Sequence, residues 1–391
     1  MKQSTLPITV PTTARAMTAI TTQQASKPAA STALPSAASS PTPITVGLDL
    51  GDRHSHFCVL DAGSKPLEEG KVAMLPKDLT AFFRRVALAR LILEVGGQSP
   101  WVSRLAQAAG LEVIVANPRR VPLITRNERK NDRTDAELLA RLGRVDPQLL
   151  SPVTHRSVEC QADLAVKRAR DVAVASRTAL INHVRGAIKS FGARLPACSA
   201  DGFHKRVLAH LPAELVPALA PIVQLIGQIA GEIKNFDVCI ERLADERYPA
   251  TKVLRQISGV GPVTALSFVL TLDSPSRVSD SRQVGPYLGL VPRTHDSGAS
   301  SPQLRITTAG DPGLRRLLVI AANRIMGPFG PDCDLKRFGL KLAAQGGKNG
   351  RKRAKVAVAR KLAVLLHRLW KTGEVYEPFY LAKKRGDAVP A

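Results

Sequence analysis

The sequence predicts an α/β domain followed by a mostly helical region, and its pattern of apolar residues supports both parts. Short apolar strands alternate with helical segments between residues 44 and 116, which is typical of an α/β layer sandwich. Two long segments with helical apolar spacing follow, and the remainder is helical and basic. We therefore expect an α/β domain at 44–155, a helical linker at 156–248 and a mostly helical domain at 249–391.

The composition indicates a partner that is a polyanion. Lysine and arginine outnumber aspartate and glutamate by 56 to 32, and the formal net charge is +24. No apolar run is expected to reach membrane-spanning length, so we expect nucleic acid and no membrane. The five cysteines are scattered and never form a Cys-x-x-Cys pair, which favours a reducing compartment and argues against structural zinc.

Residues 1–43 are expected to form a disordered tail. They are rich in Ser, Thr, Ala and Pro and contain no Asp or Glu, a composition that cannot bury a core. A transit peptide would also lack acids, but the few cations and the absence of an amphipathic pattern do not support one.

Two expected strands each carry one acid. Apolar residues alternate along 44–50 around Asp49, and a second short apolar strand, 90–94, ends at Glu94 before two glycines. Burying a carboxylate costs several kcal/mol unless it is compensated, and a divalent cation is the usual compensation at a cleft. These acids are therefore candidate metal ligands.

A polar stretch beginning at residue 127 leads into a helix that we expect Gly143 to end. Asp132 and Asp135 are three residues apart, so they share one helical face near its start. A metal ion would relieve their repulsion, whereas the alternative is a solvated helix start rich in acids. The complete ligand set suits Mg²⁺ or Mn²⁺ and comprises Asp49, Glu94, Asp132 and Asp135. This unit resembles a ribonuclease H-like core of the RuvC type.

The linker is expected to be a helical hairpin with a coiled-coil seam. In its second half, apolar residues alternate at spacings of four and three over three heptads. The seam comprises Ile222, Ile226, Ile229, Ile233, Phe236, Ile240 and Leu243. The sequence leaves open whether this seam pairs within one chain or between two.

The segment 254–265 has the pattern of a helix-hairpin-helix turn. Gly259 and Gly261 would let backbone amides approach a phosphate at the start of the next helix. An ordinary turn between helices is the alternative, because a short Gly-x-Gly is a weak signal.

The segment 335–373 carries lysine and arginine throughout and no acid. We expect a phosphate-binding face there, including Arg351, Lys352 and Arg353, although a solvated face is the alternative. Upstream, Ser297 lies in a polar Asp-Ser-Gly turn, where a serine is usually only a turn residue.

The motifs, taken in order, resemble the DEDD-type transposases of bacterial insertion sequences. They are Gly-Leu-Asp-Leu-Gly at 47–51, Leu-Glu-Val-Gly-Gly at 93–97, Asn-Asp-Arg-Thr-Asp-Ala-Glu at 131–137, Tyr-Leu-Gly-Leu-Val-Pro-Arg at 287–293 and Ser-Gly at 297–298. The similarity extends over about residues 44–380.

The resemblance implies a RuvC-like domain whose four acids bind Mg²⁺ and a transposase domain whose serine, Ser297, attacks a DNA phosphate. It also implies a guide (bridge) RNA, dimers or tetramers, and a place on the nucleoid in the bacterial cytoplasm. Further contacts to nucleic acid are expected at Arg293, Arg315 and Arg316. The sequence departs from the family pattern at Ala299, Thr308 and Ala309, where basic residues are common.

Three other interpretations remain from the sequence. A metal-dependent junction nuclease would use water and leave Ser297 as a turn residue. An actin-like sugar kinase or ATPase shares the Gly-Leu-Asp-Leu-Gly loop, but its later phosphate loops are missing and it leaves the charge unexplained. A DNA-binding protein without enzymatic activity would not need four acids.

Overall fold

The computed structural model describes residues 44–120, 131–298, 300–302 and 304–386. The expected tail at 1–43, the beginning of the polar stretch at 127–130 and Ala299 lie outside the described residues. The chain forms two compact units, divided between Val153 and Thr154. The helices expected as a separate linker belong to the second of these units.

The first unit contains a five-stranded mixed sheet with the strand order β3-β2-β1-β4-β5. β1, β2 and β3 are antiparallel neighbours, whereas β4 and β5 run parallel to β1. Their bounds are β1 Thr45–Asp49, β2 His54–Leu60, β3 Pro66–Ala73, β4 Arg90–Glu94 and β5 Glu112–Ala116. This arrangement is compatible with a ribonuclease H-like domain.

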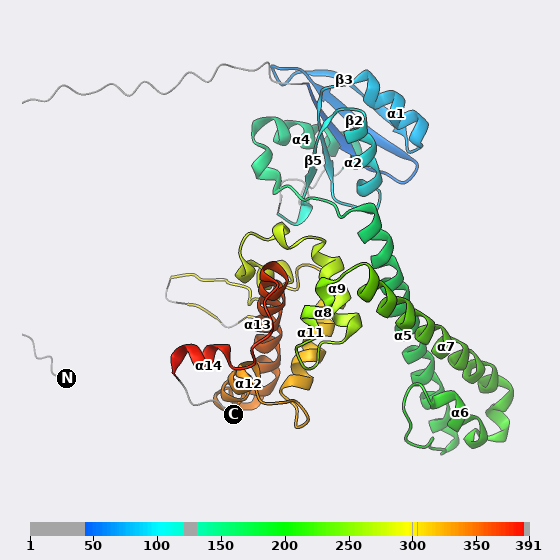
Figure 1. Ribbon diagram of the computed structural model, residues 1–391. Coiled ribbons are helices and arrows are strands. Elements are labelled where there is room, and N and C mark those ends of the chain that lie inside the picture. Colours follow the sequence, from blue (N-terminus) through cyan, green and yellow to red (C-terminus); the bar gives the residue numbers. More distant parts are fainter. Residues whose placement is uncertain (1–43, 121–130, 299, 303, 387–391) are drawn as a thin grey trace, which may run out of the picture. The chain divides into compact units, whose positions relative to one another are not determined.

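Helices cover both faces of this sheet (Figure 1). On one face, α1 (Pro76–Arg85) and α2 (Ser99–Ala108) pack on the apolar residues of β1 and β4, such as Val46 and Leu91. On the other face lies α4 (Asp132–Val145), which contacts β1 and β2 most extensively. Successive side chains of β1 therefore point alternately toward α1 and α2 on one face and toward α4 on the other.

Two glycines allow α4 to approach the sheet closely. A Cβ atom at Gly47 would overlap the carbonyl oxygen of Ala136, and one at Gly143 would overlap the Ile92 side chain. The expectation that Gly143 ends the helix is therefore wrong, because α4 continues to Val145. This glycine is explained by packing, not by termination.

The second unit begins with a hairpin of two long helices, α5 (Val158–Ala187) and α7 (Val216–Glu246), with α6 (Phe203–Val207) at its tip (Figure 1). The start of α5 packs against the end of α7, and the end of α5 packs against the start of α7. The two helices are therefore antiparallel partners within one chain. Of the expected seam, Ile226, Ile233 and Ile240 are buried, and the other members are half-buried.

The expectation that no apolar run reaches membrane-spanning length was wrong. The helical segment Ala213–Glu246 spans 34 residues at a mean hydropathy of 1.5, so it is long and apolar enough to cross a membrane by length and composition. A helix that packs in a protein core passes the same test, and α7 packs against α5. Its apolar character is thus weak support for a membrane span.

The rest of the second unit is a helical bundle, and α13 (Gly350–Thr372) supplies many of its core residues. Apolar side chains between residues 354 and 369 of α13 pack in one core with side chains of α8, α9, α11 and α12. The helices of the bundle are α8 Ala250–Leu254, α9 Pro262–Leu272, α10 Val284–Tyr287, α11 Pro312–Ile325, α12 Asp334–Gln345, α13 Gly350–Thr372 and α14 Tyr380–Arg385.

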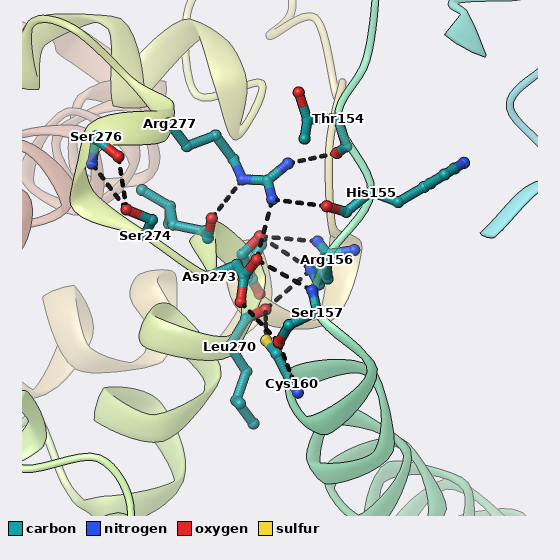
Figure 2. Close-up of polar contacts among 12 residues, drawn as sticks. Thr154, His155, Arg156, Ser157, Cys160, Leu270, Asp273, Ser274, Ser276 and Arg277 are labelled. Carbon is teal, nitrogen blue, oxygen red and sulfur yellow. Dashed lines mark hydrogen bonds and ion pairs between the residues drawn. The ribbon is translucent and has the colours of Figure 1, made fainter. Parts of the chain in front are cut away.

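The first residues of the second unit are fixed to the end of α9 (Figure 2). Arg156 donates hydrogen bonds to the carbonyl oxygens of Leu270 and Thr271 at 2.8–3.2 Å, and the Ser157 amide donates to Asp273 at 3.2 Å. Arg277 forms an ion pair with Asp273 at 3.3 Å. Asp273 has φ of +68°, a region that side chains disfavour, so these contacts hold a strained helix end.

Candidate active site

Asp49 and Glu94 lie on the same edge and the same face of the sheet. They are the last residues of β1 and β4, which are parallel neighbours. Gly47 and Ile92 face α4, and the pleat repeats every second residue, so Asp49 and Glu94 face α4 too. The two carboxylates therefore occupy adjacent strand ends beneath one helix.

Helix α4 brings two further acids to this edge. Ala136 lies over Gly47, whereas Arg144 near the other end of the helix reaches the Thr45 hydroxyl at 3.5 Å. The helix therefore runs antiparallel to β1, and its first turn, with Asp132 and Asp135, lies toward the Asp49 end. Together Asp49, Glu94, Asp132 and Asp135 are called the acidic edge.

The environment of the two helical acids differs. Asp135 is buried, with 3% of its surface exposed, whereas Asp132 is exposed and one of its carboxylate oxygens lies 3.4 Å from His56 Nδ1. His56 is the cross-strand partner of Asp49. Sequence reasoning missed this histidine, and the only available signal was its polar position within the apolar run of β2.

The donor chemistry of the acidic edge suits a divalent cation. Carboxylate oxygens are the ligands that Mg²⁺ and Mn²⁺ prefer, and a cation would offset the cost of burying Asp135. Among the described residues, however, no three His, Cys, Asp or Glu side chains are gathered closely enough to hold a metal ion. The four acids therefore share one edge without forming a closed ligand shell.

Ser297 lies at the tip of a two-stranded ribbon in the second unit. The arms are joined by the bridge between Pro292 and Ile306 and by a hydrogen bond from the Arg293 amide to the Arg305 carbonyl at 2.9 Å. We call residues 291–307 the serine ribbon; Ala299 and Gln303 within it lie outside the described residues.

The tip is a tight hairpin turn. Ser297 and Ser300 exchange backbone hydrogen bonds at 2.9 and 3.1 Å, and Gly298 between them has φ of +55°, which favours glycine. Ser297 is exposed, and within the described ranges no histidine or carboxylate is hydrogen-bonded to its hydroxyl. Activation of this hydroxyl therefore needs a group from elsewhere.

The two glycines of the expected helix-hairpin-helix turn have different surroundings. Gly259 has φ of +90° and packs closely against α11, where a Cβ atom would lie 3.2 Å from the Ala321 carbonyl oxygen. Gly261 precedes α9 and has no neighbour within 4 Å of its Cβ position. Only Gly261 is thus open to approach at a helix start.

The basic candidates also fall into two groups. Arg315 donates to the carbonyl oxygens of Leu288 and Ala309 at 3.0 and 2.5 Å, so it fixes the loop that follows the serine ribbon. Arg316 forms an ion pair with Asp171 at 3.7 Å. Arg293 of the ribbon and the first turn of α13 are exposed. This first turn contains Arg351, Lys352 and Arg353.

A second ribbon arginine was not among the sequence candidates. Arg305 is exposed and lies across the ribbon from Arg293, and like charges in opposed positions destabilise a strand pair. A phosphate between the two would remove this repulsion. No sequence signal marked Arg305, because the pairing of the two arms is a property of the folded hairpin.

Comparison with known families identifies both units. A family model of DEDD-type IS110 transposases, described as a transposase, matches residues 46–192. A second model, the transposase IS116/IS110/IS902 family, matches residues 251–333. The two matches do not overlap and together cover more than half of the chain.

Individual relatives agree with the family models. The chain is 29% identical over 339 residues to the transposase for insertion sequence element IS1111A of Coxiella burnetii, covering 85% of this chain and 90% of the relative. It is 28% identical to the transposase for insertion sequence element IS1328 of Yersinia enterocolitica, covering 73% and 85%. A probable family 20 transposase of Pseudomonas aeruginosa is also 28% identical, covering 72% and 83%.

An α/β unit with an acidic edge, joined to a basic helical unit, defines the class as an enzyme acting on nucleic acid. More particularly, the chain belongs to the DEDD-type transposases of the IS110 family. It is a DNA transposase, and its substrate is DNA.

Proposed function

We propose that this transposase cleaves and rejoins DNA through Ser297, with the acidic edge holding Mg²⁺ or Mn²⁺ beside the attacked phosphate. The observation that carries the proposal is the common face and edge of the four acids. An acidic edge on a chain with a formal charge of +24 suits an enzyme that must bind a polyanion and still place carboxylates near it.

Different groups carry out different parts of the proposed reaction. The Ser297 hydroxyl attacks phosphorus and expels the sugar oxygen of the cut strand, which leaves a phosphoserine diester that retains the bond energy for rejoining. The exposed ribbon tip lets the hydroxyl reach a DNA strand. When bound, the metal offsets the negative charge that grows on the phosphate oxygens.

The RNA guide and the assembly state are part of the same proposal and rest on the family resemblance. A guide RNA would supply the target sequence, and dimers or tetramers would form on the DNA in the bacterial cytoplasm. The acids and the serine belong to different units, so one subunit can supply the serine and another the acids.

The test uses Ser297→Ala in the full chain, with donor DNA, target DNA and the element's own RNA. We expect normal DNA binding but no covalent DNA adduct in denaturing gels, a loss of at least about 10³-fold because the nucleophile is removed. Ser300→Ala is the matched control, since Ser300 is the partner of Ser297 in the same hairpin.

Adducts formed by Ser297→Ala at the parental level would eliminate the serine mechanism and favour a junction nuclease that uses water. A mixture of Ser297→Ala with Asp49→Asn tests sharing between subunits. Recovery of product would support a composite site made by two subunits. No recovery would exclude only the sharing of the site between subunits and would leave the serine mechanism standing.

A further inference from the structure

A large groove lies in the second unit between the serine ribbon, α12, α13 and the chain around α14. Its volume is about 1230 Å³, which exceeds the range of roughly 300–1,000 Å³ that is common for small-molecule sites. The ribbon contributes Pro292, Leu304, Arg305 and Ile306 to its wall. The groove therefore has room for an extended ligand beside the two arms that carry Ser297.

The charge of this groove is strongly positive. Seven of the described lining residues are Lys or Arg, and two are Asp or Glu. Both acids are already engaged, because Asp334 accepts a hydrogen bond from the Leu381 amide at 2.6 Å and Glu377 pairs with Lys383 at 3.1 Å. Five of the lining cations form no ion pair within the described residues: Arg282, Arg305, Lys352, Arg360 and Lys361.

The lining of the groove also contains apolar residues and aromatic rings. Tyr380 at the start of α14 is 42% exposed, and the Arg368 guanidinium lies 4.4 Å from its ring centroid. Lys361 lies 3.7 Å from the Phe338 ring centroid. The aliphatic residues of the lining include Leu290, Leu335, Leu342, Val356 and Leu365.

A lining that combines unpaired cations with aromatic and aliphatic side chains suits one ligand class particularly well. A duplex hides the faces of its bases, so it would leave the aromatic and aliphatic part of the lining uncovered. A single strand can place its phosphates on the cations and stack its bases on aromatic rings. A protein partner would need an acidic and apolar surface, and it would gain nothing from the adjacent ribbon.

We propose that this groove binds single-stranded DNA, specifically the unpaired nucleotides next to the phosphate attacked by Ser297. This inference rests on the proposed function, because the choice of DNA follows from the place of the ribbon in the groove wall. Tyr380 supplies a stacking platform, and Arg305, Lys352 and Arg360 receive phosphates. The groove thus holds one strand of opened DNA beside the nucleophile.

The test measures binding of full-length protein to labelled oligonucleotides of about 12 nucleotides, using fluorescence anisotropy. The probes are single-stranded DNA, the duplex of the same sequence and single-stranded RNA. Tyr380→Ala is expected to weaken binding of single-stranded DNA roughly tenfold or more, because a stacking platform is lost. Its effect on the duplex should be less than twofold.

Two variants serve as controls. Tyr380→Phe retains the ring and should restore binding to within about twofold, which separates stacking from a fold defect. Phe329→Ala removes another exposed ring that lies beside an arginine, Arg324, but outside the groove. It should leave binding of the single strand unchanged.

A second readout locates the strand directly. Single-stranded DNA carrying 5-iodouracil should crosslink on irradiation to Tyr380 or Phe338, as mapped by mass spectrometry. The proposal is overturned if Tyr380→Ala acts no more strongly than Phe329→Ala, if duplex binding falls equally, if crosslinks lie only outside the groove, or if only RNA binding depends on Tyr380.

The two proposals can fail separately. If the groove proposal is wrong, Ser297 still forms adducts while Tyr380→Ala binds single strands normally. If the serine mechanism is wrong, adducts are independent of Ser297 while Tyr380 still controls binding of single-stranded DNA.

Discussion

The acidic edge and the serine ribbon are built in opposite ways. Asp49 and Glu94 end two central strands whose backbones are paired on both sides, and α4 covers their face. Ser297 lies on an exposed ribbon whose tip is closed by two backbone hydrogen bonds. A rigid scaffold thus holds one set of groups, whereas few contacts hold the other.

This difference matches what each set must do. Metal ligands must keep their geometry to within a fraction of an ångström, and that requires buried, well-supported backbone. A nucleophile that must reach a bound DNA strand gains from a site with low local stability. We therefore expect substitutions around the acidic edge to lower both stability and activity, whereas substitutions in the serine ribbon should lower mainly activity.

The largest effect is expected for Asp49→Asn. Loss of a charged ligand should lower strand transfer by about 10³-fold, since metal stabilisation of charge is worth several kcal/mol. Any rise in melting temperature that Mg²⁺ gives the parent protein should also disappear. Asp78→Asn on α1, across the sheet, is the charge-matched control. Normal strand transfer by Asp49→Asn would remove the acidic edge from the mechanism.

Gly47→Ala tests the rigid side of the comparison. The new methyl group would overlap the Ala136 carbonyl of α4, and overpacking of this kind costs about 3 kcal/mol or more. The melting temperature of the first unit should fall by roughly 10 °C. Gly97→Ala, which has nothing within 4 Å of the new atom, should change it little. Equal melting temperatures would show that α4 is not held tightly.

The sequence was sufficient for much of the rigid region. Alternation along 44–50 and the glycines after Glu94 marked strand ends, and the ends of parallel neighbours meet at one edge, so the common placement of these acids could be expected. The packing role of Gly143 could not be expected, because it depends on Ile92, which is distant in sequence. The same limit explains why His56 and Arg305 were missed and why the hydrogen bonds from Arg315 to loop carbonyls could not be foreseen.

Removing the positive charges at the start of α13 tests whether DNA binding depends on parts of the second unit other than the serine ribbon. Changing Arg351, Lys352 and Arg353 together to Gln should weaken binding of duplex and single-stranded nucleic acids alike, by about tenfold at physiological salt. The slope of log affinity against log salt should fall by roughly 0.9 for each phosphate that the protein no longer neutralises. An unchanged slope would return this turn to the role of a solvated surface.

The smallest effect is expected for Gly298→Ala at the ribbon tip. An alanine at positive φ costs about 1 kcal/mol, so adduct formation should slow by roughly fivefold while the melting temperature falls by no more than about 4 °C. Gly192→Ala imposes a similar strain at φ of +68° far from the ribbon and should not affect adducts. A large loss of stability in Gly298→Ala would contradict the picture of a weakly held ribbon.

The packing of α4 on β1 also has a consequence for synthesis of the chain. β1 can pair with β2 almost at once, but its parallel partner β4 and its cover α4 emerge much later from the ribosome. Contacts between residues this far apart form slowly, because a long loop must close first. Asp49 therefore meets Asp132 and Asp135 only after the whole sheet has been translated, so a nascent or truncated chain that ends before α4 has no acidic edge.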